Sequence, residues 1–205
     1  LVHQRRAVMF AGAAGTGKSS MIRDRLHALD PEVFSLREIH LNTRTDSRML
    51  QSAMEVGLEK RSGKMFGPPG AKKLVYLLDD VNMPDADRYG TQQALALLRQ
   101  QLGYNLWYDR VRRCLCDVHD VQFVACANPS AGGGHMSHRF QRNFCTFAVD
   151  APSQDTLMHI FQSIFVAHFT TFDQAVQRLA ADPLVRATLN LHNSVMQTFA
   201  PTASN

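Results

Sequence analysis

The sequence lacks several features that would indicate a membrane protein, a disulfide-rich protein or a nucleic-acid-binding protein. It has no run of 18 apolar residues, the length that a helix needs to cross a bilayer. Only four cysteines occur, and no signal-peptide pattern precedes them, so we expect reduced thiols rather than a disulfide framework. The Lys and Arg residues are scattered rather than gathered in a basic stripe. We therefore expect neither a membrane nor a nucleic-acid partner.

Metal-binding patterns are scarce as well. Cys114 and Cys116 are separated by one residue, which lacks the two-residue gap of a zinc knuckle, and no second cysteine pair exists. The alternation Cys114-Leu115-Cys116 is typical of a strand that carries both sulfur atoms on one face. The nine histidines are dispersed, and no two stand four residues apart on a helical run. We expect no metal site among these residues.

The two ends of the sequence look arbitrary. The chain begins Leu-Val-His-Gln-Arg-Arg, without an initiator Met, and it ends Ala-Pro-Thr-Ala-Ser-Asn. We expect it to be a piece of a longer protein. Its 205 residues and 45% hydrophobic content suffice for one domain with a sizeable core and a small appendage. The net charge of +4 is mildly basic, and we expect nucleotide phosphate and neighbouring protein to balance it.

The most informative segment lies near the beginning of the chain. Residues 12–19 fit the phosphate-binding pattern G-x-x-x-x-G-K-[ST]. In this pattern the glycine-rich backbone wraps a polyphosphate with its N–H groups, the lysine meets the β- and γ-phosphates, and the serine hydroxyl binds Mg²⁺. The candidate phosphate-binding residues are Gly12, Ala13, Ala14, Gly15, Thr16, Gly17, Lys18, Ser19 and Ser20.

The surroundings of this segment predict an α/β fold. The apolar run at 7–11 is typical of a buried strand, and 19–29 follows with helical spacing, so the loop ends at a helix N-terminus, where the dipole favours anions. Further strands are predicted at 35–41, 74–78, 121–127 and 145–149, and further helices at 47–60, 91–102, 153–168, 172–180 and 183–199. Alternating strands and helices imply a parallel sheet with its ligand site at the carboxyl ends of the strands.

Other segments complete the outline. Residues 62–73 contain three Gly and two Pro and are predicted to form an irregular surface loop. Residues 106–121 are typical of a hairpin with a charged turn, and 130–134 of a flexible loop. Because only helices are predicted from residue 151 onward, we expect an α/β nucleotide-binding domain over 1–150 and a truncated helical subdomain over 151–205.

Two carboxylates follow the apolar run at 74–78. Beside a phosphate loop, Asp79 can hold Mg²⁺ opposite Ser19, whereas an Asp at a strand end is otherwise a turn residue. Asp80 stands where many nucleotide hydrolases of this architecture carry a Glu that polarises the attacking water. Asp is shorter by about 1.5 Å, and a misplacement of about 1 Å can cost about 100-fold in rate. We therefore expect Asp80 to be a weak general base with slow turnover, or only to hold the water network.

Polar residues later in the chain are candidates for the same chemistry. Asn128 ends a buried strand, where a γ-phosphate or the attacking water would satisfy its amide; the alternative is an Asn-Pro turn. Arg139 and Arg142 precede the last predicted strand. Arg139 is a candidate for a finger that stabilises charge on a neighbouring module's nucleotide in trans. The alternatives are a solvated basic patch or stacking on Phe140 and Phe144.

Taken together, the motifs resemble an AAA+ module of a dynein heavy chain. The specific matches are Leu74–Asp80 with Val81-Asn82-Met83-Pro84 after it, and Phe66-Gly67-Pro68-Pro69-Gly70. Supporting matches are Gly12–Ser19, Tyr89-Gly90-Thr91-Gln92, Leu98-Arg99-Gln100, Trp107-Tyr108-Asp109-Arg110, Val121-Gln122-Phe123-Val124 and Asn128-Pro129. The combination is most similar to the third module of the motor ring in its axonemal form, over about residues 7 to 202.

This resemblance implies a P-loop NTPase of the AAA+ fold, with a five-stranded parallel sheet flanked by helices and a partial helical lid, in a ring of six modules. It implies ATP or ADP and Mg²⁺ as ligands, in a module that gates the first one. Asp79 would be the Mg²⁺ acid, Asp80 would take the place of the catalytic carboxylate, Asn128 would be the sensor and Arg139 the finger serving the preceding module. The implied partners are the neighbouring modules of the heavy chain, dynein intermediate and light chains and, indirectly, the microtubule of a ciliary or flagellar axoneme.

Three functions stay open at this point. The first is a regulatory ATP-binding module that hydrolyses ATP slowly. The second is a nucleotide-binding structural module without turnover. The choice between the first two depends on Asp80, which replaces the usual Glu. The third is a module of another ring-forming remodelling ATPase. Because the chain stops near Pro201, before a second sensor arginine, we also expect weak nucleotide binding by the isolated chain.

Overall fold

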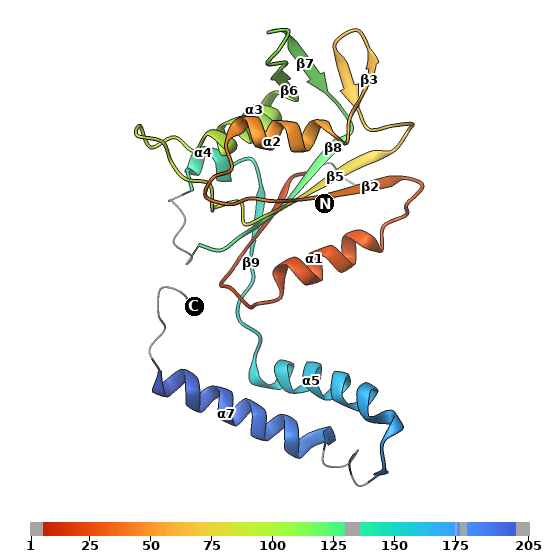
Figure 1. Ribbon diagram of the computed structural model, residues 1–205, viewed down its shortest axis with the longest axis vertical. Coiled ribbons are helices and arrows are strands. Elements are labelled where there is room, and N and C mark those ends of the chain that lie inside the picture. The colour runs from red at the N-terminus through yellow and green to blue at the C-terminus, as the bar shows by residue number, and fades with distance from the viewer. Residues whose placement is uncertain (1–5, 130–135, 175, 177–179, 200–205) are drawn as a thin grey trace. The chain divides into compact units, whose positions relative to one another are not determined.

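A five-stranded parallel sheet, ordered β2-β5-β8-β1-β9, organises the first 151 residues of the computed structural model (Figure 1). This confirms the predicted sheet. The strands are β1 (Val8–Ala11), β2 (Phe34–His40), β5 (Lys73–Asp79), β8 (Val121–Ala127) and β9 (Cys145–Ala148). The structure describes residues 6–129, 136–174, 176 and 180–199, so the predicted loop at 130–134 lies outside the described residues.

Helices cover both faces of this sheet. Helix α1 lies on one face, and α2, α3 and α4 lie on the other (Figure 1). Their bounds are α1 (Lys18–His27), α2 (Ser47–Glu55), α3 (Gln93–Tyr104) and α4 (His138–Gln141). This arrangement explains the continuous apolar run of β5, because successive side chains of a strand point to opposite faces.

The core therefore has two parts, one on each face of the sheet. On β5, Tyr76 and Leu78 are fully buried in the larger cluster, which includes residues of α2 and α3. Val75 and Leu77 point the other way and pack with α1 residues such as Ile22. Each face of β5 is thus closed by a helix, and its carboxyl end is left at the edge of the sheet where the loop after β1 also lies.

The sequence predicted only part of a second sheet. Its strands are β3 (Glu59–Ser62), β4 (Met65–Gly67), β6 (Leu106–Tyr108) and β7 (Leu115–Val118), in the order β3-β4-β7-β6. The β6–β7 pair confirms the predicted hairpin. The prediction of an irregular loop over 62–73 is wrong for residues 62, 65–67 and 73, which lie in β3, β4 and β5. The helix predicted over 47–60 ends at residue 55.

Long-range pairing explains both differences. Strand β4 pairs with β7, about fifty residues further along, where Asp117 N donates to Lys64 O and His119 N donates to Phe66 O, both at 3.0 Å. Gly63 takes a left-handed φ of 54° in the β3–β4 turn. Gly63 therefore makes a turn between paired strands instead of breaking regular structure, which local propensity cannot show.

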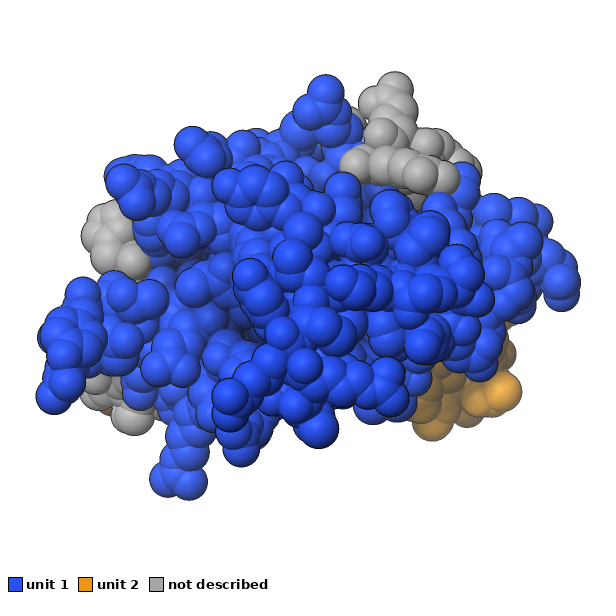
Figure 2. Space-filling model, turned by 90° about the horizontal axis from the view of Figure 1, so that it is seen from above, with its two compact units in different colours: residues 1–151 blue, residues 152–205 orange. Residues whose placement is uncertain are grey.

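Residues 152–205 form a second compact unit, coloured separately in Figure 2. Its described elements are helical: α5 (Gln154–His168), the 3₁₀ turn η2 (Phe169–Thr171), the π-helical turn η3 (Ala180–Leu184) and α7 (Val185–Thr198). Ser153 caps α5 by accepting a hydrogen bond from Thr156 N. The helix predicted over 172–180 falls partly outside the described residues. Among the residues that are described, no helix has the length and apolarity to cross a membrane.

Candidate functional site

The loop between β1 and α1 has the backbone shape that its glycines predict. Gly15 and Gly17 have left-handed φ angles of 77° and 80°, which cost other residues about 1–2 kcal/mol. Gly12 is required for a different reason, since a Cβ atom there would lie 2.1 Å from the carbonyl oxygen of Val149. Its N–H donates to Ala127 O of β8 at 3.1 Å. The loop is thus held between β8 and the residue that follows β9.

Lys18 begins α1 and is buried, with 8% of its surface exposed. Its ammonium donates to Ala13 O at 2.6 Å and to Thr16 Oγ1 at 3.1 Å. Thr16 Oγ1 in turn donates to Ala13 O at 3.1 Å. Among the described residues, no carboxylate lies within ion-pair distance of this ammonium. A buried cation with only neutral partners fits a site for an anion, as does the helix N-terminus beside it.

Ser19 and Asp79 meet although sixty residues separate them. Ser19 Oγ donates to Asp79 Oδ1 at 2.8 Å. The hydroxyl belongs to the first turn of α1, which follows β1, and the carboxylate ends β5, so the two parallel strands bring them to the same edge of the sheet. Hydroxyl and carboxylate oxygens are ligands that Mg²⁺ prefers. The residues present therefore fit the metal that the sequence pattern implies.

Asp80 has an unusual backbone conformation. Its φ is 55°, in the left-handed region, and its N–H contacts Asp79 Oδ1 at 3.2 Å. Burial and the adjacent charge of Asp79 raise the pKa of its carboxyl group, while His40 and Lys18 oppose the shift. The Asp80 carboxyl group is therefore close enough to Asp79, His40 and Lys18 to be affected by their charges. A carboxylate there can accept a proton from water at the edge of the site.

Asn82 is a site residue to which the sequence analysis assigned no role. It is 4% exposed, its Nδ2 donates to Asn128 O at 2.9 Å, and its Oδ1 accepts from Asn128 N at 2.9 Å. This pair of hydrogen bonds holds the backbone of Asn128 beside the segment that carries Asp80. The signal was the position of Asn82 two residues after the paired aspartates.

Two further residues beside Asp79 were not predicted from the sequence. His40 ends β2, in register with Asp79, and its Nδ1 lies 3.7 Å from Asp79 Oδ2. Cys126 is buried on β8, and burial raises the pKa of its thiol to about 11, with the charge of Asp79 adding to the effect. The thiol is therefore protonated at neutral pH. Neither residue belongs to a motif, and only the order of the strands places them beside Asp79.

An apolar pocket of about 380 Å³ adjoins Lys18. Its lining includes Phe10, Met21, Ile22 and Val149, so it offers a flat apolar group, such as a purine ring, a place beside the phosphate loop. Arg25 supplies one further cation at its wall.

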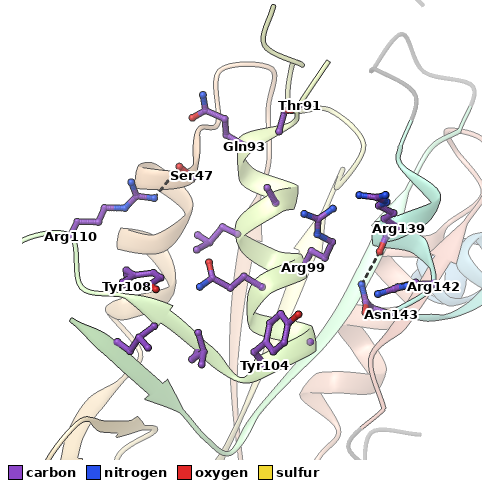
Figure 3. Close-up of a pocket in the computed structure, with 16 residues that line it drawn as sticks. Ser47, Thr91, Gln93, Arg99, Tyr104, Tyr108, Arg110, Arg139, Arg142 and Asn143 are labelled. Carbon is purple, nitrogen blue, oxygen red and sulfur yellow. Dashed lines mark hydrogen bonds between the residues drawn. The ribbon is translucent and has the colours of Figure 1, made fainter. Parts of the chain in front are cut away.

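The two candidate arginines do not line this apolar pocket. Arg139 and Arg142 are exposed, and with Arg99 of α3 they line a separate cavity of about 1140 Å³ (Figure 3). The side-chain amide of Asn143 donates to Arg139 O at 3.2 Å, which fixes the backbone there. Phe140 is buried and packs against Phe144 at 5.0 Å between ring centroids. The structure therefore presents Arg139 on a surface apart from Lys18.

A lysine enclosed by a glycine loop, with a serine–aspartate pair at the carboxyl edge of a parallel sheet, is the arrangement of the P-loop class of proteins. Within that class the match is more specific. Residues 1–152 match the family model of the P-loop containing dynein motor region, and the chain belongs to this family.

Individual relatives agree with the family. The chain is 44% identical over 198 residues to human dynein axonemal heavy chain 17, with 96% of the chain and 4% of the relative covered. It is 44% identical over 205 residues to the ciliary dynein beta chain of Tripneustes gratilla, covering 99% of the chain and 4% of the relative. It is 40% identical over 203 residues to the flagellar outer arm beta chain of Chlamydomonas reinhardtii, covering 99% and 4%. The chain thus spans about 4% of the length of these relatives.

Proposed function

We propose that this chain is a regulatory ATP-binding module of an axonemal dynein heavy chain, and that it hydrolyses ATP slowly. The observation that carries the proposal is the 2.8 Å hydrogen bond between Ser19 Oγ and Asp79 Oδ1, beside the buried ammonium of Lys18. Groups from two distant parts of the chain, Lys18 with Ser19 and Asp79, converge there on one place for a triphosphate and its metal. The relatives, whose names are those of axonemal, ciliary and flagellar dyneins, support the setting.

Each residue has a distinct task in this proposal. The backbone N–H groups of 12–20 and the Lys18 ammonium bind the phosphates of ATP or ADP, and Ser19 and Asp79 hold Mg²⁺. Bound Mg²⁺ neutralises phosphate charge. Asp80 accepts the proton of the attacking water, and Asn128, held by Asn82, orients that water.

The place of the module in the whole protein is a further part of the proposal. The motif Asp79-Asp80-Val81-Asn82-Met83-Pro84 and the segment Phe66–Gly70 favour the third module of the ring, which gates the first. Residues 1–150 form the large nucleotide-binding subdomain, and 151–205 begin the helical lid. Arg139 acts on the nucleotide of the preceding module, consistent with its exposed position away from Lys18.

The proposed partners follow from that place. They are the neighbouring modules of the same heavy chain, dynein intermediate and light chains, and the microtubule indirectly, within the axoneme of a cilium or flagellum. We propose no nucleic-acid or membrane partner. Membership of the dynein family argues against the module of another remodelling ATPase.

Replacement of Asp80 tests the catalytic part. In an otherwise intact motor, Asp80→Asn should reduce single-turnover hydrolysis at this site by about 100-fold or more, because general-base catalysis contributes about 10²–10⁴. Nucleotide affinity should remain, since Asn tolerates the left-handed backbone of residue 80. Asp85→Asn is the matched control, because Asp85 is exposed and lies on the same segment. Unchanged hydrolysis in the Asp80 variant rules out its role as general base.

A nucleotide-binding structural module without turnover is the second candidate. One observation favours it: the short side chain of Asp80 extends from a backbone in the left-handed region, with its N–H directed to Asp79. The same assay separates the two candidates. If the unmodified site retains ADP and shows no hydrolysis that Asp80→Asn can abolish, the structural module is correct.

A further inference from the structure

We propose that Asp109, Cys114 and Cys116 form a binding site for a thiophilic divalent cation of the Zn²⁺ class, at the turn between β6 and β7. One carboxylate oxygen and the two sulfur atoms all lie within 4.8 Å of one another. The spacing of the cysteines by itself predicted no metal site, since it provides two ligands from one strand. The turn supplies what the spacing lacks, because it brings a carboxylate back over the sulfur atoms.

The turn holds the carboxylate in place without a metal. Asp109 N donates to Cys114 O at 2.9 Å, and Arg113 N donates to Asp109 O at 2.8 Å, which closes the turn. Asp109 Oδ1 accepts the backbone N–H groups of Val111 and Arg112, both at 2.8 Å. These two hydrogen bonds fix the orientation of the Asp109 carboxylate. A ligand that is already fixed and charged loses little entropy when it binds a cation.

Cys116 lies on β7, and Cys114 directly precedes that strand. Cys116 is 4% exposed and Cys114 is half-buried, whereas Leu115 between them is exposed. Binding of the cation would displace the proton of each thiol to solvent, so that two thiolates and one carboxylate would face a doubly charged ion.

Access and coordination number fit the same class of cation. Asp109 and Cys116 line a cavity of about 880 Å³ between α2 and the second sheet. Water from this cavity can fill a fourth position, which completes a tetrahedron with three protein ligands, as in open zinc sites. Sulfur ligands disfavour Mg²⁺ and Ca²⁺, so the site differs in kind from the oxygen pair of Ser19 and Asp79. The inference does not depend on nucleotide binding.

The test uses Co²⁺ as a spectroscopic probe on the full chain, reduced and freed of metal, in excess Mg²⁺ so that oxygen sites are occupied. We expect one equivalent of Co²⁺ to give thiolate-to-metal charge-transfer absorption and the d–d bands of a tetrahedral ion, and Zn²⁺ to displace it. Cys114→Ser and Cys116→Ser should each remove or strongly reduce the charge-transfer band. Loss of an outer-shell partner weakens metal binding about 10- to 100-fold, so Asp109→Asn, which replaces an anionic ligand with a neutral amide, should weaken it at least about tenfold.

Two controls make the result decisive. Asp109→Asn keeps an oxygen that accepts the two turn hydrogen bonds, so its effect reports the lost charge rather than a lost turn. Cys145→Ser replaces an exposed cysteine on β9 and should leave the spectrum unchanged. Circular dichroism checks that each variant is folded, and Cys114→Ser, at the more exposed position, remains informative if Cys116→Ser does not fold. Thiolate bands that persist in folded Cys114→Ser, or the absence of such bands from the unmodified chain, overturn the proposal.

Discussion

At the residue scale, the buried polar groups of this molecule differ in the partners that they find. Lys18 is buried with neutral partners beside a cradle for an anion, whereas the buried amide of Gln92 is satisfied because its Nε2 donates to Pro84 O at 2.8 Å. Gln101 is also fully buried, yet among the described residues neither its Oε1 nor its Nε2 has a hydrogen-bond partner. These differences lead to two predictions.

Lys18→Ala should abolish triphosphate binding. The variant removes a charged donor to the phosphate oxygens, and each hydrogen bond to a charged group contributes about 1.5–3 kcal/mol. Isothermal calorimetry with a slowly hydrolysed ATP analogue and Mg²⁺ measures the loss. Lys64→Ala is the control, since Lys64 is exposed in the β3–β4 turn. Equal affinity in the Lys18 variant and the unmodified chain would refute the assignment of the phosphate site.

Gln101→Met should raise the free energy of unfolding by about 1–3 kcal/mol, the cost of a buried polar group that lacks a partner. Met has a similar length and no donor or acceptor to satisfy, so the packing of α3 is preserved. Gln92→Met is the matched contrast and should lower stability, because it leaves the Pro84 carbonyl unpaired. Urea unfolding of both variants measures these changes in the free energy of unfolding. A loss of stability in Gln101→Met would show that the amide has a partner, such as a buried water.

At the scale of elements, a local sequence signal determines where helix α2 begins, and long-range strand pairing determines where it ends. Helix α2 begins where a cap is encoded locally, since Asp46 Oδ1 accepts from Met49 N at 2.7 Å. It ends at Glu55, five residues before the end of the predicted helix, because the chain turns into a strand whose sheet includes β7. Periodicity thus predicted that a helix exists here, and tertiary pairing decided its length.

The α2 cap supplies a prediction at this scale. Asp46→Ala should lower the free energy of unfolding by about 1 kcal/mol, because it leaves a backbone donor of the first turn without its acceptor. Asp46→Asn should retain most of the stability, since the amide oxygen accepts the same hydrogen bond. Chemical denaturation of the two variants side by side separates capping from charge. If both lose the same amount, the charge of Asp46 rather than its cap stabilises the helix.

At the scale of the whole molecule, the candidate phosphate site lies within one compact unit, and the second unit is helical. The loop, Ser19 and Asp79 all belong to the first unit. A ligand that binds only the folded form stabilises it, by about 2.7 kcal/mol at a concentration 100 times its dissociation constant. Nucleotide and metal should therefore act on the stability of the chain as well as on its activity.

We accordingly expect ATP with Mg²⁺ to raise the melting temperature of the chain in a concentration-dependent way. Removal of Mg²⁺ with a chelator should reverse much of the shift, because Ser19 and Asp79 then no longer hold the metal against the phosphates. Differential scanning calorimetry measures the effect, with Lys18→Ala as the control that should not respond. An identical melting temperature with and without the ligand pair would mean that the folded chain has no such site.

The sequence by itself determined the central sheet, the phosphate loop and the likeness to dynein modules, because each depends on a short pattern whose physics is local. A glycine loop between an apolar strand and a helix can be identified without knowing the rest of the chain, and the buried runs of β5 and β8 show which strands are central. The hydrogen bond between Ser19 and Asp79 follows from the same reasoning, since carboxyl ends of parallel strands share one edge.

Only the tertiary structure decided which distant residues meet. The second sheet, the Asn82 contacts to Asn128, the position of His40 beside Asp79 and the approach of Asp109 to the two cysteines each depend on strand order or on the closure of a turn. No sequence pattern predicts these contacts, because in each group the partner lies on another element or across a turn. Their physical cause is the pairing of strands, which determines proximity independently of distance along the chain.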